Sequence, residues 1–164
     1  MADQRLLIIG VGNPDRGDDG AGRAVIRALR ARIGARADND TPTLIEQSGE
    51  STLLIEAMQG FSNVVIIDAA DFGAMPGSHR RFDVGEAALP SNLTGMSSHG
   101  FGVPQAIELA RALGTLPERC TVYAIQAVSF EAGEPLSPAV ATATDIVATE
   151  IFNAFVKASE PSHA

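Results

Sequence analysis

The chain has 164 residues, of which 45% are hydrophobic and 20% charged, a composition that fits one globular domain with a sizeable core. Acidic residues outnumber basic ones by 20 to 12, and the net charge of −8 disfavours nucleic acid as a partner, because nucleic-acid binding needs a basic surface. No apolar run approaches the roughly 18 residues of a membrane span, and the only cysteine, Cys120, cannot form an intramolecular disulfide. We therefore expect a cytoplasmic protein with no membrane partner.

The first predicted strand, residues 5–11, is an apolar run of the kind that is buried on both faces of a sheet. A glycine-rich loop follows and carries the adjacent carboxylates Asp18 and Asp19. Apolar spacing over residues 19–33 then predicts an amphipathic helix that either acid could cap. We assign Asp18 to the cap and Asp19 to a functional role, although spacing alone leaves the two roles open.

The rest of the chain alternates between strand and helix patterns. The predicted strands are residues 43–47, 63–68, 79–84 (an edge strand) and 121–128, and the predicted helices are residues 51–59, 103–113 and a last helix that begins at Ser137-Pro138. Residues 86–98 have no periodicity and are interpreted as a functional loop, and the tail from about residue 157 is expected to be flexible. The pattern predicts a single α/β domain over residues 1–164, three layers deep, with a mostly parallel twisted sheet of about five strands between helices.

Dinucleotide binding is the first function that the glycine loop suggests. Gly10-Val11-Gly12 begins a G-x-G-x-x-G fingerprint, but Asp15 occupies the third glycine position. Asp18 and Asp19 then stand where a pyrophosphate would bind, and carboxylates repel phosphate. We expect no organic cofactor.

A metal site is the second candidate, formed by Asp19, Asp68 and His99. Both acids follow predicted strands and should meet at the carboxyl edge of the sheet, where ligands bind in such folds. His99 joins them if the loop of residues 86–98 folds over that edge. Two carboxylates and one imidazole suit a divalent ion such as nickel or zinc, and three protein ligands leave positions open for metal-assisted hydrolysis. Each residue also has a structural explanation, as a helix cap, a loop anchor or a polar filler.

Nucleophilic catalysis has weaker support. The chain has no G-x-S-x-G elbow, and Ser129 follows a strand with no base beside it in the sequence. Cys120 has the pattern of an inert, partly buried thiol. Neither His79, beside two arginines, nor His163, in the tail, has the surroundings of a catalytic base.

The run GVGNPDRGDDGAG, residues 10–22, resembles the N-terminal motif of the hydrogenase maturation proteases. Three further segments are similar to that family: residues 65–69 around Asp68, Ser98-His99-Gly100-Phe101-Gly102, and residues 128–140. The resemblance covers nearly the whole chain. It implies an α/β fold and a metal site of Asp19, Asp68 and His99, with Asp19 at a position where related proteins often have glutamate.

The resemblance also implies an activity. The enzyme would be an endopeptidase that removes the C-terminal extension of a nickel-iron hydrogenase large-subunit precursor after nickel insertion, with the nickel carried by the precursor. Asp19, Asp68 and His99 would engage the metal and act in catalysis, with one aspartate doubling as general base. A non-catalytic nickel-binding assembly factor is the alternative from another class. A peptidyl-tRNA hydrolase-like enzyme, whose Gly-Asn-Pro turn is similar to residues 12–14, is opposed by the net charge of −8.

Overall fold

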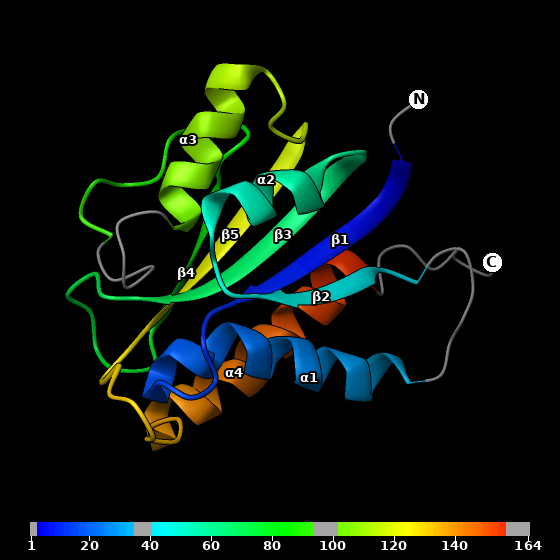
Figure 1. Ribbon diagram of the computed structural model, residues 1–164. Coiled ribbons are helices and arrows are strands. Elements are labelled where there is room, and N and C mark those ends of the chain that lie inside the picture. The colour runs from blue at the N-terminus through cyan, green and yellow to red at the C-terminus, as the bar shows by residue number, and fades with distance from the viewer. Residues whose placement is uncertain (1–2, 35–40, 94–101, 157–164) are drawn as a thin grey trace.

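The computed structural model describes residues 3–34, 41–93 and 102–156, which form a sheet with helices on both faces (Figure 1). The strands are β1 (Asp3–Val11), β2 (Thr43–Gln47), β3 (Phe61–Ala70), β4 (His79–Asp83) and β5 (Arg119–Gln126). The helices are the short 3-10 helix η1 (Gly17–Gly20), α1 (Ala21–Ile33), α2 (Ser51–Met58), α3 (Val103–Leu113), α4 (Pro138–Ile151) and a final π-helical turn, η2 (Phe152–Val156).

The strand order is β2-β1-β3-β5-β4, with β4 antiparallel to β5 and every other neighbouring pair parallel. The predicted fold class and the predicted edge strand are confirmed. From β1 the chain passes to β2 on one side and then to β3 on the other. The carboxyl ends of β1 and β3 therefore form the topological switch point, where ligands bind in open α/β sheets.

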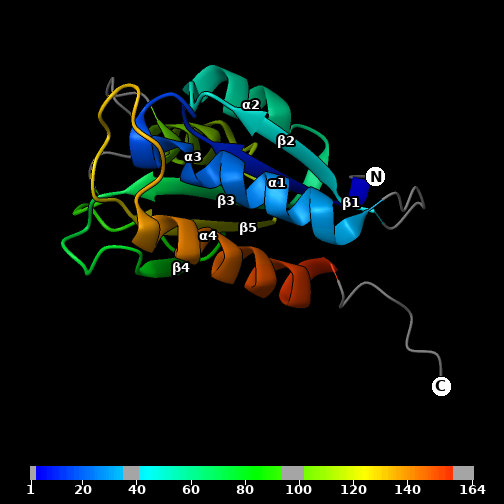
Figure 2. The same cartoon turned by 90° about the horizontal axis from the view of Figure 1, so that it is seen from below.

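Hydrophobic side chains bury both faces of the sheet. Within β3, Ile66 packs into the cluster that contains α2 and α3, whereas Ile67 packs into the cluster that contains α1 and α4. Figure 1 shows α2 and α3 on one side of the sheet, and Figure 2 shows α1 and α4 side by side on the other. Because both faces are covered, the central strands are continuous apolar runs.

The last helix combines apolar composition with packing against the sheet. Residues Pro138–Val156 have a hydropathy of 1.3, long and apolar enough to cross a membrane by length and composition alone. In the fold, however, Val140, Val147 and Ile151 are fully buried in the core that α4 shares with α1. Core packing therefore explains the apolar residues on the inner side of this helix, which amount to a third of the segment.

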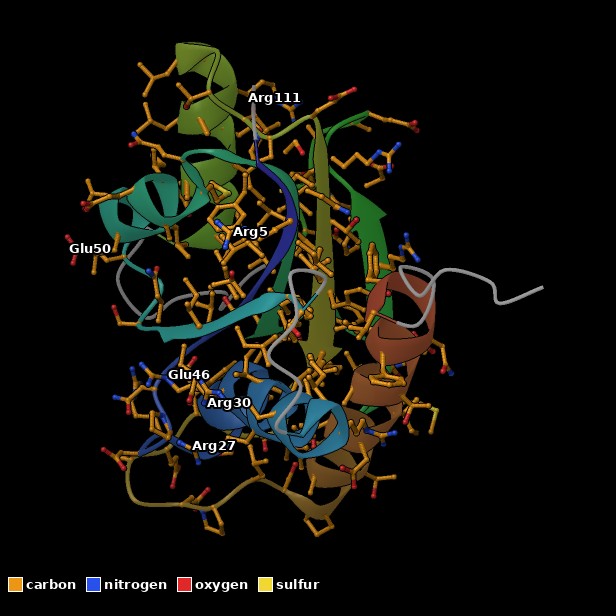
Figure 3. All side chains as sticks on the ribbon, turned by 90° about the vertical axis from the view of Figure 1, so that its right-hand side faces the viewer. Arg5, Arg27, Arg30, Glu46, Glu50 and Arg111 are labelled. Carbon is orange, nitrogen blue, oxygen red and sulfur yellow. The ribbon has the colours of Figure 1, made fainter. Side chains whose placement is uncertain are left out.

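The arginines on the outer side of α1 pair with the neighbouring strand. Glu46 of β2 lies 2.6 Å from Arg30 and 3.4 Å from Arg27, both from carboxylate oxygen to guanidinium nitrogen (Figure 3). Arg27 and Arg30 themselves remain about half exposed. These arginines therefore stay in contact with solvent while they pair with Glu46.

Candidate active site

Two glycines bring the loop after β1 close to the ends of the strands. Gly12 has a φ of +136°, and a Cβ there would lie 1.8 Å from the carbonyl oxygen of Asp19. A Cβ at Gly22, in the first turn of α1, would lie 2.4 Å from the carbonyl oxygen of Ile67 in β3. Only glycine permits both approaches. The segment that carries Asp19 is thereby held against the carboxyl ends of β1 and β3.

Asp19 lies in η1 and is half-buried. One of its carboxylate oxygens, Oδ2, accepts the backbone N–H of Asn13 at 3.0 Å. Burial raises the pKa of Asp19, while the Asn13 hydrogen bond and the positive charges of Arg16 and Arg23 act in the opposite direction. Asp19 is therefore a partly exposed carboxylate at the carboxyl edge of the sheet, the edge on which the sequence places it.

Asp68 is more deeply placed than the sequence indicated. β3 continues two residues past it to Ala70, so the prediction that the strand ends at Asp68 is wrong. Asp68 is 1% exposed, and within the described residues its Oδ2 is buried without a hydrogen-bond partner. Burial and the nearby charge of Asp19 raise its pKa well above the usual value, against the effect of a hydrogen bond from the Ala69 N–H. A buried carboxylate with a free oxygen is suited to hold a cation or a proton.

His99 lies outside the described residues, so its place in the site stays a prediction. The described chain resumes at Gly102, the N-cap residue of α3. The carbonyl oxygen of Gly102 accepts a hydrogen bond from the Ser51 hydroxyl at 3.3 Å. Over residues 3–34, 41–93 and 102–156, no three His, Cys, Asp or Glu side chains form a metal-binding group. Of the predicted ligands, the structure thus shows only the two acids near each other.

Asp18 does not cap α1, contrary to the sequence assignment. The N-cap residue of α1 is Gly20, which makes no side-chain cap bond. Asp18 is buried, and its carboxylate accepts hydrogen bonds from Val128, Ser129 and Ser137 instead. Ser137 is the N-cap residue of α4, and its hydroxyl also faces Asp18. The pattern Ser137-Pro138 predicts the start of α4. It does not predict that Ser137 contacts Asp18.

The structure also shows the surroundings of Cys120, Ser129 and His79, the other residues considered for catalysis. Cys120 is buried in β5, and burial raises the pKa of its thiol to about 12, which removes the thiolate form that a nucleophile needs. Ser129 Oγ lies 3.1 Å from a carboxylate oxygen of Glu134. His79 Nε2 lies 2.9 Å from Glu150 Oε1 on α4. The two acids remain the chemically distinctive groups.

One family model and several curated proteins are similar to this chain. The family model described as "Hydrogenase maturation protease" matches residues 24–154. The hydrogenase expression/formation protein HupD of Rhizobium leguminosarum bv. viciae is 28% identical over 134 residues, which cover 81% of this chain and 65% of that protein. Across three curated relatives named HupD the matched share of their length is 58%, 65% and 71%, so the chain spans about two thirds of these proteins.

Solved structures show the same fold. The [NiFe] hydrogenase maturation protease HybD from Thermococcus kodakarensis is 26% identical, with a TM-score of 0.70 and coverage of 93% of this chain and 99% of that chain. The hydrogenase maturating endopeptidase HybD from E. coli is 20% identical with a TM-score of 0.72, and covers 94% of each chain. With the family model spanning most of its length, the chain belongs to the hydrogenase maturation protease family.

Proposed function

We propose that the protein is an endopeptidase that removes the C-terminal extension of a nickel-iron hydrogenase large-subunit precursor after nickel has been inserted. The family to which the chain belongs supports proteolysis in hydrogenase maturation. The observation that carries the proposed site is the buried Oδ2 of Asp68, which has no hydrogen-bond partner in the described residues and lies near the charge of Asp19. Two neighbouring carboxylates repel each other, and a divalent cation between them removes that repulsion.

In this proposal, nickel belongs to the substrate, the large-subunit precursor. The precursor brings it to the edge of the sheet, and Asp19, Asp68 and His99 bind it there. Carboxylate and imidazole ligands suit nickel. Recognition of the metal makes cleavage depend on its prior insertion, because a nickel-free precursor offers no cation to the two acids.

Asp19, Asp68 and His99 would hold the nickel of the precursor beside the scissile peptide, and the metal would supply a Lewis acid for its carbonyl group. We assign the role of general base to Asp68. Asp68 is buried at the site, and its Oδ2 has no hydrogen-bond partner among the described residues, so this oxygen can accept a proton. Asp68 accepts a proton from the attacking water and returns it to the leaving amine. The chain has a single cysteine, Cys120, and so cannot form an intramolecular disulfide, and we place its action in the cytoplasm.

The experiment is a processing assay with purified precursor. The protein is mixed with nickel-loaded large-subunit precursor, and the precursor's mass is followed by mass spectrometry. We expect loss of one defined C-terminal peptide, with no change in the nickel-free precursor. Equal cleavage of both forms would overturn metal recognition. Stoichiometric binding without a mass change would instead identify a nickel-binding assembly factor.

Variants test the residues. Asp19→Ala, Asp68→Ala and His99→Ala should each abolish processing while the domain stays folded. Asp145→Asn, an exposed acid on α4, is the matched control and should process at the wild-type rate. Normal processing by His99→Ala would remove that residue from the proposed site.

A further inference from the structure

Asp18 is a buried acid that the proposed chemistry does not use. It is 1% exposed. Its Oδ2 accepts the backbone N–H groups of Val128 at 2.7 Å and Ser129 at 3.2 Å, and its Oδ1 accepts the N–H of Ser137 at 2.7 Å. The Ser137 hydroxyl lies 3.0 Å from both carboxylate oxygens. Asp18 and Ser137 are 119 residues apart in the chain, so this cluster joins two distant segments.

Backbone contacts join the same two segments. Three hydrogen bonds link them: Gly17 N–H to Glu134 O at 3.0 Å, Asp18 N–H to Ser129 O at 2.9 Å, and Gly133 N–H to Asp15 O at 2.8 Å. A Cβ at Gly17, whose φ is +56°, would lie 2.7 Å from the carbonyl oxygen of Ser129. The turn that contains η1 and the loop of residues 127–137 are thus packed together, and that loop leads directly into α4.

Asp19 follows Asp18 in the same short helix, so its place depends on where that helix is held. Its N–H bonds to the carbonyl oxygen of Arg16 at 3.1 Å, and its carboxylate accepts the N–H of Asn13. We propose that Asp18 is a positioning residue that holds Asp19 beside Asp68 by tying η1 to the loop of residues 127–137 and to the start of α4. The effect on cleavage rests on the proposed function, whereas the effect on geometry does not.

The cluster requires a carboxylate at this position. The three backbone groups around Asp18 are all donors, and an ionised carboxylate has acceptors on both oxygens. An asparagine has only one side-chain oxygen that accepts hydrogen bonds. Its NH₂ group would take the place of the second oxygen and face a backbone N–H, which is also a donor. The negative charge also lies at the N-terminus of α4, where the helix dipole favours an anion. Removal of the charge therefore leaves buried N–H groups without partners.

The test compares Asp18→Asn with Asp15→Asn, an exposed acid of the same loop that undergoes the same change of charge. Amide hydrogen exchange, measured by NMR, reports on the Asn13 N–H, because this group is bonded to Asp19. In Asp18→Asn we expect it to exchange about tenfold faster, the factor that corresponds to one lost hydrogen bond to a charged group. Core amides in β3 and β5 should exchange as in the wild type, as should Asn13 in the control.

The second readout is kinetic, with nickel-loaded precursor as substrate. At a temperature at which Asp18→Asn is folded, kcat should fall about tenfold or more, whereas Asp15→Asn should match the wild type. Ser137→Ala removes only the hydroxyl group and should shift both readouts in the same direction by less. If Asp18→Asn fails to fold, this milder variant carries the test.

Two outcomes separate the inference from the proposed function. Wild-type exchange at Asn13 in every folded variant of Asp18 and Ser137 would overturn the positioning role. Faster exchange at Asn13, combined with a wild-type protein that does not cleave the precursor, would support the positioning role and reject the proposed function.

Discussion

The carboxylate of Asp19 lies close enough to Asp68 that its charge raises the pKa of Asp68. The two residues come from different segments, one from η1 after β1 and the other from within β3. Parallel pairing of β1 with β3 brings these segments together at the carboxyl edge of the sheet. The arrangement stores electrostatic repulsion at the site, which a cation or a proton relieves.

Replacement of Asp19 should lower the pKa of Asp68. The Asp19→Asn variant removes the charge that raises it, while burial of Asp68 is retained. A ¹³C NMR titration of the aspartate carboxyl groups measures the shift directly. Asp15→Asn, which removes a charge from an exposed position of the same loop, should leave the titration of Asp68 unchanged. An Asp68 pKa that is identical in wild type and Asp19→Asn would show that the two acids do not interact.

Processing should decline as the pH falls through the raised pKa of Asp68. Protonation of Asp68 removes the carboxylate that is proposed to bind the metal and to act as general base, so the loss should approach roughly tenfold per pH unit on the acidic side. Rates of cleavage of nickel-loaded precursor across pH 5 to 8 provide the measurement, with the metal content of the precursor checked at each pH. A rate that stays constant over this range, in a protein whose Asp68 titrates within it, would contradict the role of Asp68.

Replacement of Asp68 by asparagine should stabilise the fold at neutral and higher pH while it abolishes processing. The folded-state pKa of Asp68 is raised above its ordinary value of 3.8, so the folded protein binds the proton more tightly than the unfolded chain. The contribution of Asp68 to stability is therefore fully present below that ordinary value and is lost as the pH rises through the raised pKa. Asp68→Asn avoids this loss, and we expect a gain of about 1 kcal/mol in the free energy of unfolding at pH 8.

Urea unfolding at pH 8 and at pH 4 measures this effect. The stability difference between Asp68→Asn and the wild type should be larger at the higher pH. Asp145→Asn, the exposed acid on α4, should show no such pH-dependent gain. A variant that is less stable than the wild type at pH 8 would mean that the ionised carboxylate is well satisfied in the native protein.

A side chain at Gly22 should destabilise the protein, although alanine normally favours helix. In an unobstructed helix interior, Gly→Ala adds about 1 kcal/mol of stability. At Gly22 the new Cβ would lie 2.4 Å from the carbonyl oxygen of Ile67 and 2.5 Å from that of Val11, both in strands. We expect Gly22→Ala to cost about 1–3 kcal/mol, the usual range for overpacking. A rise in the thermal unfolding temperature would contradict the close approach of α1 to the sheet.

The elements themselves were largely predictable. The strand at residues 43–47 and the helix at residues 103–113 are confirmed with the bounds expected. The edge strand near residues 79–84 was recognised by its charges, and β4 occupies His79–Asp83. Such predictions succeed because a helix or strand that buries one or both faces has its apolar residues at regular spacing along the sequence.

The errors concern residues whose partners are distant in the chain. The apolar run of residues 63–68 predicts a strand that ends at Asp68, whereas β5 pairs with both of the next residues, Ala69 and Ala70. Asp18 was assigned to the nearest helix, but its carboxylate bonds to the start of α4 instead. A side-chain hydrogen bond between distant segments has no periodicity, so no window of sequence reveals it.

The sequence by itself determined the order and type of the elements, and from these the edge of the sheet that carries Asp19 and Asp68. It could do so because hydrophobic periodicity records which faces are buried, and parallel strands place the loops that follow them on one edge. Only the tertiary structure decided how the surroundings of the two adjacent acids differ. Asp18 is enclosed by backbone donors from the segment before α4, whereas Asp19 remains partly exposed near the unpaired oxygen of Asp68. Burial and hydrogen-bond satisfaction of a side chain arise only when distant segments pack together, so they cannot be read from local sequence.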